Sequence, residues 1–308
     1  MKTKFFITLT FSFILIGTFA QPKVKKTENV VYGMISGMAL LMDVYQPENS
    51  NGMGVVVIYG SAFGYFGSYQ RVYNQIPLKD DYTADKKYAA KWSQELVNKG
   101  YTLFVINHRF SPRFKHGEIL EDSRRAVRFI RYNAKTYKIN PNKIGAIGQS
   151  SGGHLSALLG SVDTPFDNVN KNPVDSVSSK VQAVVSMAGP MIMTDLNTKQ
   201  DTISDHKLVT KIILNLFGEL PDLKNGEFVF NGKFAEASPI NHITKNDAPM
   251  LLYHSEDDNL IPYRHAVKMN QKLIEMGVET KLIIQKKTGH NAVPDIDEVD
   301  AWFKMYLK

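Results

Sequence analysis

The sequence predicts an α/β protein with a mostly parallel central sheet and helices on both faces of that sheet. Six short runs are continuously apolar and rich in β-branched residues, a pattern typical of strands buried on both faces. They span residues 55–59, 102–106, 143–147, 181–187, 250–254 and 281–284. Helical patterns alternate with these runs, and the alternation indicates parallel strands joined by crossover helices.

The elements follow one another in a regular order. A polar leader at 21–27 precedes two short predicted strands at 29–35 and 39–45, and the buried strands follow. Helices are expected at 88–98, 120–137, 152–161, 263–275 and 295–306. The clearest is 120–137, where Leu120, Val127 and Ile130 recur at helical spacing on an apolar face.

Two stretches interrupt the alternation. Residues 64–85 are rich in Tyr, Gly and Asp and are expected to form a long loop after the first buried strand. Residues 195–237 combine a helical pattern at 208–217 with a turn-rich segment at 218–233. Long insertions in compact domains are often lids or binding loops, so the second stretch is interpreted as a small cap. A surface excursion without a role is the alternative.

The N-terminus has the features of a secretory signal peptide. Lys2 and Lys4 precede an uncharged, largely apolar run at 5–19, and Ala20 is a small residue before Gln21. This predicts a signal peptide at 1–20, cleaved near Ala20–Gln21, and a secreted or periplasmic mature chain at 21–308 without stable membrane insertion. An uncleaved anchor is the alternative, but the run is shorter than the roughly 20 residues that span a bilayer.

Composition excludes several classes of function. The 308 residues include no cysteine, which rules out disulfides, thiolate metal sites and a cysteine nucleophile. The net charge of +7 comes from scattered lysines, whereas a nucleic-acid binder gathers its charge into a stripe or a recognisable module. No nucleic-acid partner is therefore expected.

The segment after the strand at 143–147 carries the main chemical signal. Gly148, Ser150 and Gly152 form Gly-x-Ser-x-Gly between a predicted strand and a predicted helix. Such a turn exposes a serine nucleophile above the sheet, and side chains at the flanking glycines would collide with backbone. The amide of Ser151 then lies at a helix N-terminus and can stabilise an oxyanion.

A nucleophilic serine needs a base, and the base needs an orienting carboxylate, in the chain order serine, acid, histidine. Glu256, Asp257 and Asp258 follow the strand at 250–254, at the edge where open α/β sheets carry their sites. Among the histidines after the serine, only His290 follows a later strand on a loop. His290 is therefore the predicted base.

The second part of the oxyanion hole should follow the first buried strand, where Gly60 and Ser61 are expected to supply backbone amides. A simple glycine-rich turn is the alternative interpretation. His154 is interpreted as structural support. No metal motif or phosphate-binding motif is present, so no metal and no organic cofactor is expected.

These segments resemble the α/β-hydrolases of the esterase/lipase type, close to bacterial carboxylesterase and feruloyl-esterase-like domains, over about residues 55–308. The resemblance rests on the sequence around Ser150, on 254–262 and on Gly289-His290. It implies an α/β-hydrolase fold, and the His-Gly-x-x-Asp pattern of relatives implies that Asp258 is the acid. The His-Gly-Gly start of the relatives' oxyanion segment is Tyr59-Gly60-Ser61 in this chain.

The resulting hypothesis is a secreted serine esterase that forms an acyl-enzyme on Ser150, with Asp258 and His290 completing a triad in a single domain. Small-molecule or carbohydrate-linked esters are the expected substrates, acetyl or feruloyl esters of polysaccharides among them. The alternatives are a secreted serine peptidase of the same fold and a catalytically silent binding protein. A silent protein would fail to react with a fluorophosphonate probe at Ser150.

Overall fold

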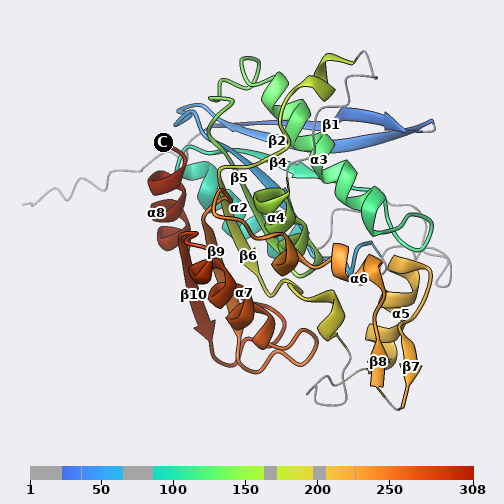
Figure 1. Cartoon of the computed structure of the whole chain (residues 1–308). Coiled ribbons are helices and arrows are strands. Elements are labelled where there is room, and N and C mark those ends of the chain that lie inside the picture. The colour runs from blue at the N-terminus through green and yellow to red at the C-terminus, as the bar shows by residue number, and fades with distance from the viewer. Residues whose placement is uncertain (1–22, 36, 65–85, 163–171, 197–205, 226) are drawn as a thin grey trace, which may run out of the picture.

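The computed structural model describes residues 23–35, 37–64, 86–162, 172–196, 206–225 and 227–308 (Figure 1). An eight-stranded sheet runs through the molecule in the order β1-β2-β4-β3-β5-β6-β9-β10. Its strands are β1 (Val24–Ile35), β2 (Met38–Pro47), β3 (Gly54–Ile58), β4 (Thr102–Ile106), β5 (Ile144–Gln149), β6 (Ala183–Met187), β9 (Met250–Ser255) and β10 (Thr280–Gln285). The six strands from β4 to β10 are parallel, whereas β1 and β2 pair antiparallel at one edge.

Helices cover both faces of the sheet, as the sequence predicts. They are α2 (Lys86–Asn98), α3 (His116–Tyr132), α4 (Ser151–Ser161), α7 (Arg264–Glu275) and α8 (Ile296–Tyr306). Residues of α3, α4 and α7 share one core cluster, and residues of α2 and α8 share the other. The parallel α/β architecture expected from the sequence is therefore confirmed.

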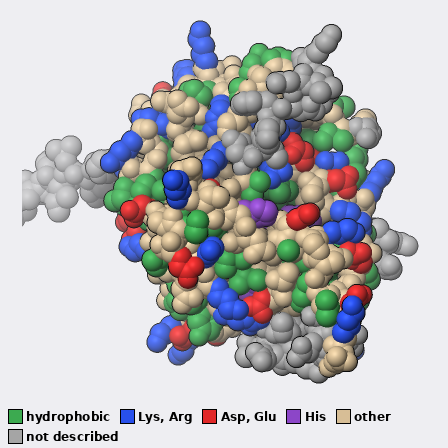
Figure 2. All heavy atoms as spheres, in the orientation of Figure 1, with side chains coloured by type: hydrophobic (Ala, Val, Ile, Leu, Met, Phe, Trp, Pro, Cys, Tyr) green, Lys and Arg blue, Asp and Glu red, His purple; other side chains and the backbone are tan. Residues whose placement is uncertain are grey.

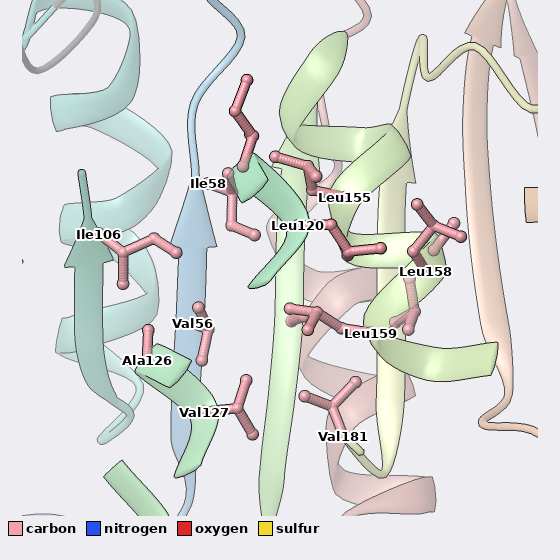
Figure 3. Packing of buried hydrophobic residues seen from close by; sticks show 14 of the residues in the cluster. Val56, Ile58, Ile106, Leu120, Ala126, Val127, Leu155, Leu158, Leu159 and Val181 are labelled. Carbon is pink, nitrogen blue, oxygen red and sulfur yellow. The ribbon is translucent and has the colours of Figure 1, made fainter. Parts of the chain in front are cut away.

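The central strands contribute side chains to both clusters, because successive side chains of a strand point to opposite faces of the sheet. In β3, Val56 and Ile58 belong to the cluster under α3 and α4, whereas Val55 and Val57 belong to the other cluster. Figure 3 shows the first cluster, with side chains from β3 and β4 meeting those from α3 and α4. Burial on both faces explains why these strands are continuously apolar in sequence.

Two elements, β1 and α3, differ most from the sequence prediction. The strand β1 begins at Val24, inside the segment interpreted as a polar leader, and its first residues pair with the end of β2. An edge strand needs no alternating burial, so its polar residues hide the strand signal. Helix α3 spans His116–Tyr132 rather than 120–137. Its start is fixed by the Lys115 amide, which donates to the Glu118 carboxylate (2.9 Å), and turns rather than helix follow Tyr132.

An insertion between β6 and β9 carries most of the remaining structure. It contains η2 (Met193–Asp195), α5 (His206–Phe217), β7 (Asp222–Lys224), β8 (Glu227–Val229), α6 (Gly232–Glu236) and η3 (Pro239–His242). Figure 1 shows α5, β7 and β8 grouped together to one side of the sheet. The helix expected at 208–217 is present, and the segment expected to be turn-rich contains the antiparallel pair β7–β8.

The remaining features concern the ends and the surface. The signal peptide predicted at 1–20 lies outside the described residues, as does the predicted loop from residue 65 onward. A short η1 (Pro173–Ser176) precedes β6. None of the helices among the described residues is both long and apolar enough to cross a membrane. On the face shown in Figure 2, acidic and basic side chains are interspersed rather than gathered by sign.

Candidate active site

The turn between β5 and α4 holds Ser150 in a strained conformation. Ser150 has a φ of +53° and a ψ of −122°, a backbone conformation that residues other than glycine rarely adopt. A Cβ on Gly152 would lie 1.8 Å from the Ile58 carbonyl oxygen, and one on Gly148 would lie 2.3 Å from the Gly152 carbonyl oxygen. Only glycine fits at both positions, so the two glycines allow β5, the serine turn and β3 to approach this closely.

Ser150, His290 and Asp258 form one row of hydrogen-bonding groups at the carboxyl edge of the sheet. The His290 Nε2 lies 2.9 Å from the Ser150 Oγ, and the His290 Nδ1 lies 2.9 Å from the Asp258 Oδ2. Gly289, with a φ of +56°, precedes the histidine in the loop after β10, and its amide donates to the Asp257 carboxylate (3.1 Å). The structure thus brings together three side chains that the sequence separates by up to 140 positions.

Asp258 is surrounded by donors. The amides of Leu260 and Ile261 each donate to its Oδ1 at 2.9 Å, and the imidazoles of His290 and His254 approach its Oδ2 at 2.9 and 3.1 Å. Burial by itself would raise the pKa of this carboxyl, but the hydrogen bonds from His254 and His290 outweigh burial and hold the pKa well below 3.8. Asp258 is therefore a buried carboxylate that stays ionised beside His290.

His254 is a member of this cluster that the sequence analysis did not assign. Chain order excluded it as the base, but its Nε2 faces both the Asp258 carboxylate and the Ile261 carbonyl oxygen (2.7 Å). The side chain is fully buried. The only sequence signal is its place four residues before Asp258 across the end of β9. His254 thus holds the acid and the turn after it in register.

The three candidate oxyanion donors lie in the same pocket as Ser150. Ser151 is the first residue of α4, where backbone amides have no acceptor inside the helix. Gly60 and Ser61 follow β3. A Cβ on Gly60 would lie 2.9 Å from the Ser150 Cβ, so this turn packs directly against the turn that holds Ser150. The Ser61 amide, however, donates to the Ser151 Oγ at 3.0 Å. That contact was not foreseen from sequence.

A buried ion pair holds the segment that carries these amides. The Arg109 Nε lies 2.9 and 3.0 Å from the two carboxylate oxygens of Asp122, whose side chain is fully buried. Two residues later the Ser111 amide donates to the Phe63 carbonyl oxygen (3.0 Å). A Cβ on Gly64 would lie 2.1 Å from the Phe110 Cβ. The loop after β4 thus supports the turn that follows β3.

His154 contacts the support of the pocket rather than Ser150. Its Nδ1 lies 2.7 Å from the Pro190 carbonyl oxygen, its Nε2 lies 2.8 Å from the His116 Nε2, and its ring meets the Phe63 ring edge-on. Burial lowers the pKa of His154 to about 4, so it is neutral at ordinary pH. The structural interpretation of His154 agrees with these contacts, and the partnership with His116 is an addition to it.

Ser150 opens into a cavity of about 190 Å³. Its polar lining is concentrated at the reacting groups, namely Ser61, Gln149, Ser150, Ser151, His290 and Asn291. Most of its apolar lining comes from η2, α5 and the residue after η2 in the insertion, and most of the rest comes from Phe63, Pro190, Leu260 and Ile261. Among the residues that the structure describes, no group of three or more acidic or histidine side chains could hold a metal ion.

The arrangement can therefore perform nucleophilic chemistry on a carbonyl compound. The Ser150 hydroxyl has a neighbouring imidazole to accept its proton, the imidazole has an ionised carboxylate on its other nitrogen, and the candidate oxyanion donors line the same pocket.

Comparisons with known proteins fit this geometry. The probable carboxylic ester hydrolase LipM of Mycobacterium tuberculosis is 28% identical over 56% of this chain and 37% of its own length. The acetylxylan esterase of Xylanibacter ruminicola is 30% identical over 41% of this chain and 22% of its own length. The chain spans only 37–57% of the lengths of the first curated relatives it matches.

A truncated carbohydrate esterase from gut microbiota has a similar structure, with a TM-score of 0.69 and 23% identity over 92% of this chain and 96% of that one. This likeness shows that the fold is the α/β-hydrolase fold. A model of the BD-FAE family matches residues 42–273, which include Ser150 and Asp258 and end before His290. Because the match covers most of the described sheet and its helices, the chain belongs to the BD-FAE family.

Proposed function

We propose that the protein is a carboxylic ester hydrolase that forms an acyl-enzyme on Ser150. The observation that carries the proposal is the row of two 2.9 Å contacts from Ser150 through His290 to Asp258, with the serine lining a cavity. The curated relatives named as carboxylic ester hydrolase and acetylxylan esterase support hydrolysis of an ester.

In the acylation step, the Ser150 Oγ attacks the ester carbonyl carbon and its proton passes to the His290 Nε2. The Asp258 carboxylate holds the ring so that Nδ1 carries a proton and Nε2 is free to accept one, and it then stabilises the imidazolium. When the tetrahedral intermediate collapses, the alcohol oxygen leaves with the proton from Nε2. Water repeats these steps on the acyl-enzyme and releases the carboxylic acid.

The oxyanion is to be held by the amide of Ser151 and by the turn at Gly60 and Ser61. Each such donor contributes roughly 3 kcal/mol to transition-state stabilisation in comparable sites. The Ser61 amide donates to the Ser151 hydroxyl in the structure, so its use requires that hydroxyl to turn away. The rotation would free the Ser61 amide for the oxyanion that develops next to it.

Two further parts of the proposal concern substrate and location. Acetyl and feruloyl esters of polysaccharides are candidate substrates, which the named acetylxylan esterase relative supports for the acetyl group.

The basic and then apolar N-terminal segment supports export, with cleavage near Ala20–Gln21. Mass spectrometry of the protein exported by a bacterial host should find a mature N-terminus at Gln21, and retention of Met1 would contradict export by cleavage.

The test of the catalytic proposal uses Ser150→Ala, with Ser156→Ala as the matched control. Ser156 lies on the same helix, and its buried hydroxyl has no hydrogen-bond partner within the described structure. We expect Ser150→Ala to lose turnover of p-nitrophenyl acetate and labelling by a fluorophosphonate, while Ser156→Ala keeps both. A silent binding protein would not react with the probe in any form. Undiminished hydrolysis by folded Ser150→Ala would overturn the assignment.

A further inference from the structure

We propose that the site takes unbranched aliphatic acyl groups longer than acetyl, with the acyl chain lying in the aliphatic part of the cavity beneath α5. The inference rests on the proposed esterase function and names the acyl class of the same site. The observation that carries it is that the cavity containing Ser150 is also lined by a set of aliphatic side chains from the insertion, which we call the aliphatic chamber.

The chamber is built from side chains of the insertion. They are Met193, Leu196, Val209, Ile212, Ile213 and Leu216. Five of the six are at most 4% exposed, and only Ile212 is partly exposed. On α5 the four members lie at positions i, i+3, i+4 and i+7, which is the spacing of one helix face. One continuous aliphatic wall therefore borders the cavity.

The wall lies beside the turn at Gly60 and Ser61, which we call the oxyanion turn. The Phe63 ring meets the His116 ring edge-on at a centroid distance of 6.1 Å, and His116 stacks on Phe217 of α5 at 6.0 Å. The Lys115 Nζ also donates to the Asn215 carbonyl oxygen in α5 (3.0 Å). These contacts anchor α5 to the side of the cavity that carries the amides.

The direction of proton transfer decides which part of an ester enters the chamber. The leaving alcohol oxygen must come within hydrogen-bond reach of the His290 Nε2 to receive its proton. The alcohol therefore lies toward His290 and the neighbouring Asn291, and the acyl chain extends from the carbonyl carbon in the other direction. We place the acyl chain on the side of α5, because the Phe63, His116 and Phe217 rings join that helix to the oxyanion turn.

The lining selects among acyl groups by desolvation. Each methylene group that leaves water for an aliphatic surface is worth about a fourfold gain in an equilibrium or rate ratio. An acetyl group offers only a methyl and leaves the chamber unused. A feruloyl group would bring a phenol and a methoxy oxygen, yet the polar lining among the described residues lies at the reacting end. An unpaired buried hydroxyl costs roughly five- to hundredfold in affinity.

The experiment measures kcat/KM for p-nitrophenyl acetate, butyrate and hexanoate below their solubility limits, together with methyl ferulate. Each value is divided by the rate of spontaneous hydrolysis, which removes the intrinsic reactivity of the ester. We expect kcat/KM to rise about fourfold per added methylene to hexanoate, and methyl ferulate to fall below methyl butyrate measured in the same way.

Two variants of α5 test where the chain lies. Ile212→Gln places an amide on the partly exposed chamber position, and Leu214→Gln makes the same change on the exposed face of the helix, where Leu214 is 44% exposed. We expect Ile212→Gln to lower the ratio of hexanoate to acetate turnover at least fivefold and Leu214→Gln to leave this ratio at the parental value. Thermal melting verifies that both variants fold.

The outcomes separate this inference from the proposed function. A protein that labels at Ser150 and hydrolyses acetate, but shows flat or falling kcat/KM with chain length, remains an esterase and refutes the aliphatic chamber. The chamber is also refuted if Ile212→Gln and Leu214→Gln change the hexanoate to acetate ratio alike. Absence of labelling and of turnover with every ester refutes the proposed function itself.

Discussion

The sharpest test of the site is Asp258→Asn, because the structure dictates how the new amide must lie. The backbone amides of Leu260 and Ile261 both donate to the Asp258 Oδ1, so the oxygen of the asparagine must occupy that position. Its NH₂ group then takes the position of Oδ2, facing His290 and His254. The opposite orientation would point two donors at two backbone donors, at a cost of roughly 1–3 kcal/mol for each unsatisfied group.

With the NH₂ group in that place, the His290 Nδ1 must accept a hydrogen bond in its shorter contact (2.9 Å), and the Oδ1 position at 3.2 Å already accepts hydrogen bonds from two backbone donors. The Nδ1 proton therefore moves to Nε2, the nitrogen that faces the Ser150 Oγ, and the imidazole can no longer take the serine proton. Loss of the correct tautomer lowers kcat by about 10⁴-fold in a comparable triad, which corresponds to about 5 kcal/mol of transition-state stabilisation. We expect a loss of this size in Asp258→Asn.

The assay follows p-nitrophenyl butyrate hydrolysis, with the protein concentration fixed by absorbance and folding verified by circular dichroism. Glu256→Gln is the matched control, since it makes the same chemical change at an exposed position of the same loop. The control should keep kcat/KM within about threefold, because surface substitutions are usually worth less than about 0.5 kcal/mol. Folded Asp258→Asn that retains more than a tenth of the parental kcat/KM would refute the tautomer argument.

Three further outcomes are expected. Gly60→Ala should lower kcat about a hundredfold, because a Cβ there lies 2.9 Å from the Ser150 Cβ and small displacements of reacting groups cost that much. A slower acylation burst at an unchanged melting temperature would show that the substitution affects the site and not the stability of the fold. The ionised Asp258 stabilises the fold above pH 3.8, and this contribution should fall as the pH drops below 3.8 toward its lower folded-state pKa. Urea unfolding at pH 5 and pH 3 should therefore show a shrinking difference between the parent and Asp258→Asn, and a growing difference would reverse the sign of this linkage. Asp122→Ala should lower the melting temperature by at least about 6 °C in calorimetry, because it leaves the Arg109 guanidinium without its buried partner; a smaller shift would show that Arg109 finds another acceptor.

The sequence predicts those parts of the fold in which one physical constraint dominates. Strands such as 54–58 are buried on both faces, so their apolar character is continuous and their position is evident. The strand β1 was missed over its first residues because it lies at an edge and its polar side chains face water. The hairpin of β7 and β8 was missed because each of its strands has only three residues.

The candidate site, too, could be predicted from the sequence only in part. Ser150 and His290 could be named because a nucleophile elbow fixes chain order and placement, and resemblance added Asp258. The second histidine on that carboxylate, His254, and the bond from the Ser61 amide to the Ser151 hydroxyl depend on side-chain rotamers in three dimensions. No residue pattern along the chain encodes those contacts, so only the folded structure reveals them.

The origin of α5 has a consequence for how such a protein can diversify. The helix belongs to a stretch between β6 and β9 that contributes no strand to the main sheet, whereas Ser150, Asp258 and His290 are carried by the ends of strands. Substitutions on α5 that leave Phe217 and the Lys115 contact in place can therefore change the cavity lining without altering the strands that position Ser150, Asp258 and His290. If the proposed function and aliphatic chamber hold, the acyl preference of this fold can be engineered in α5 while the three proposed catalytic residues stay unchanged.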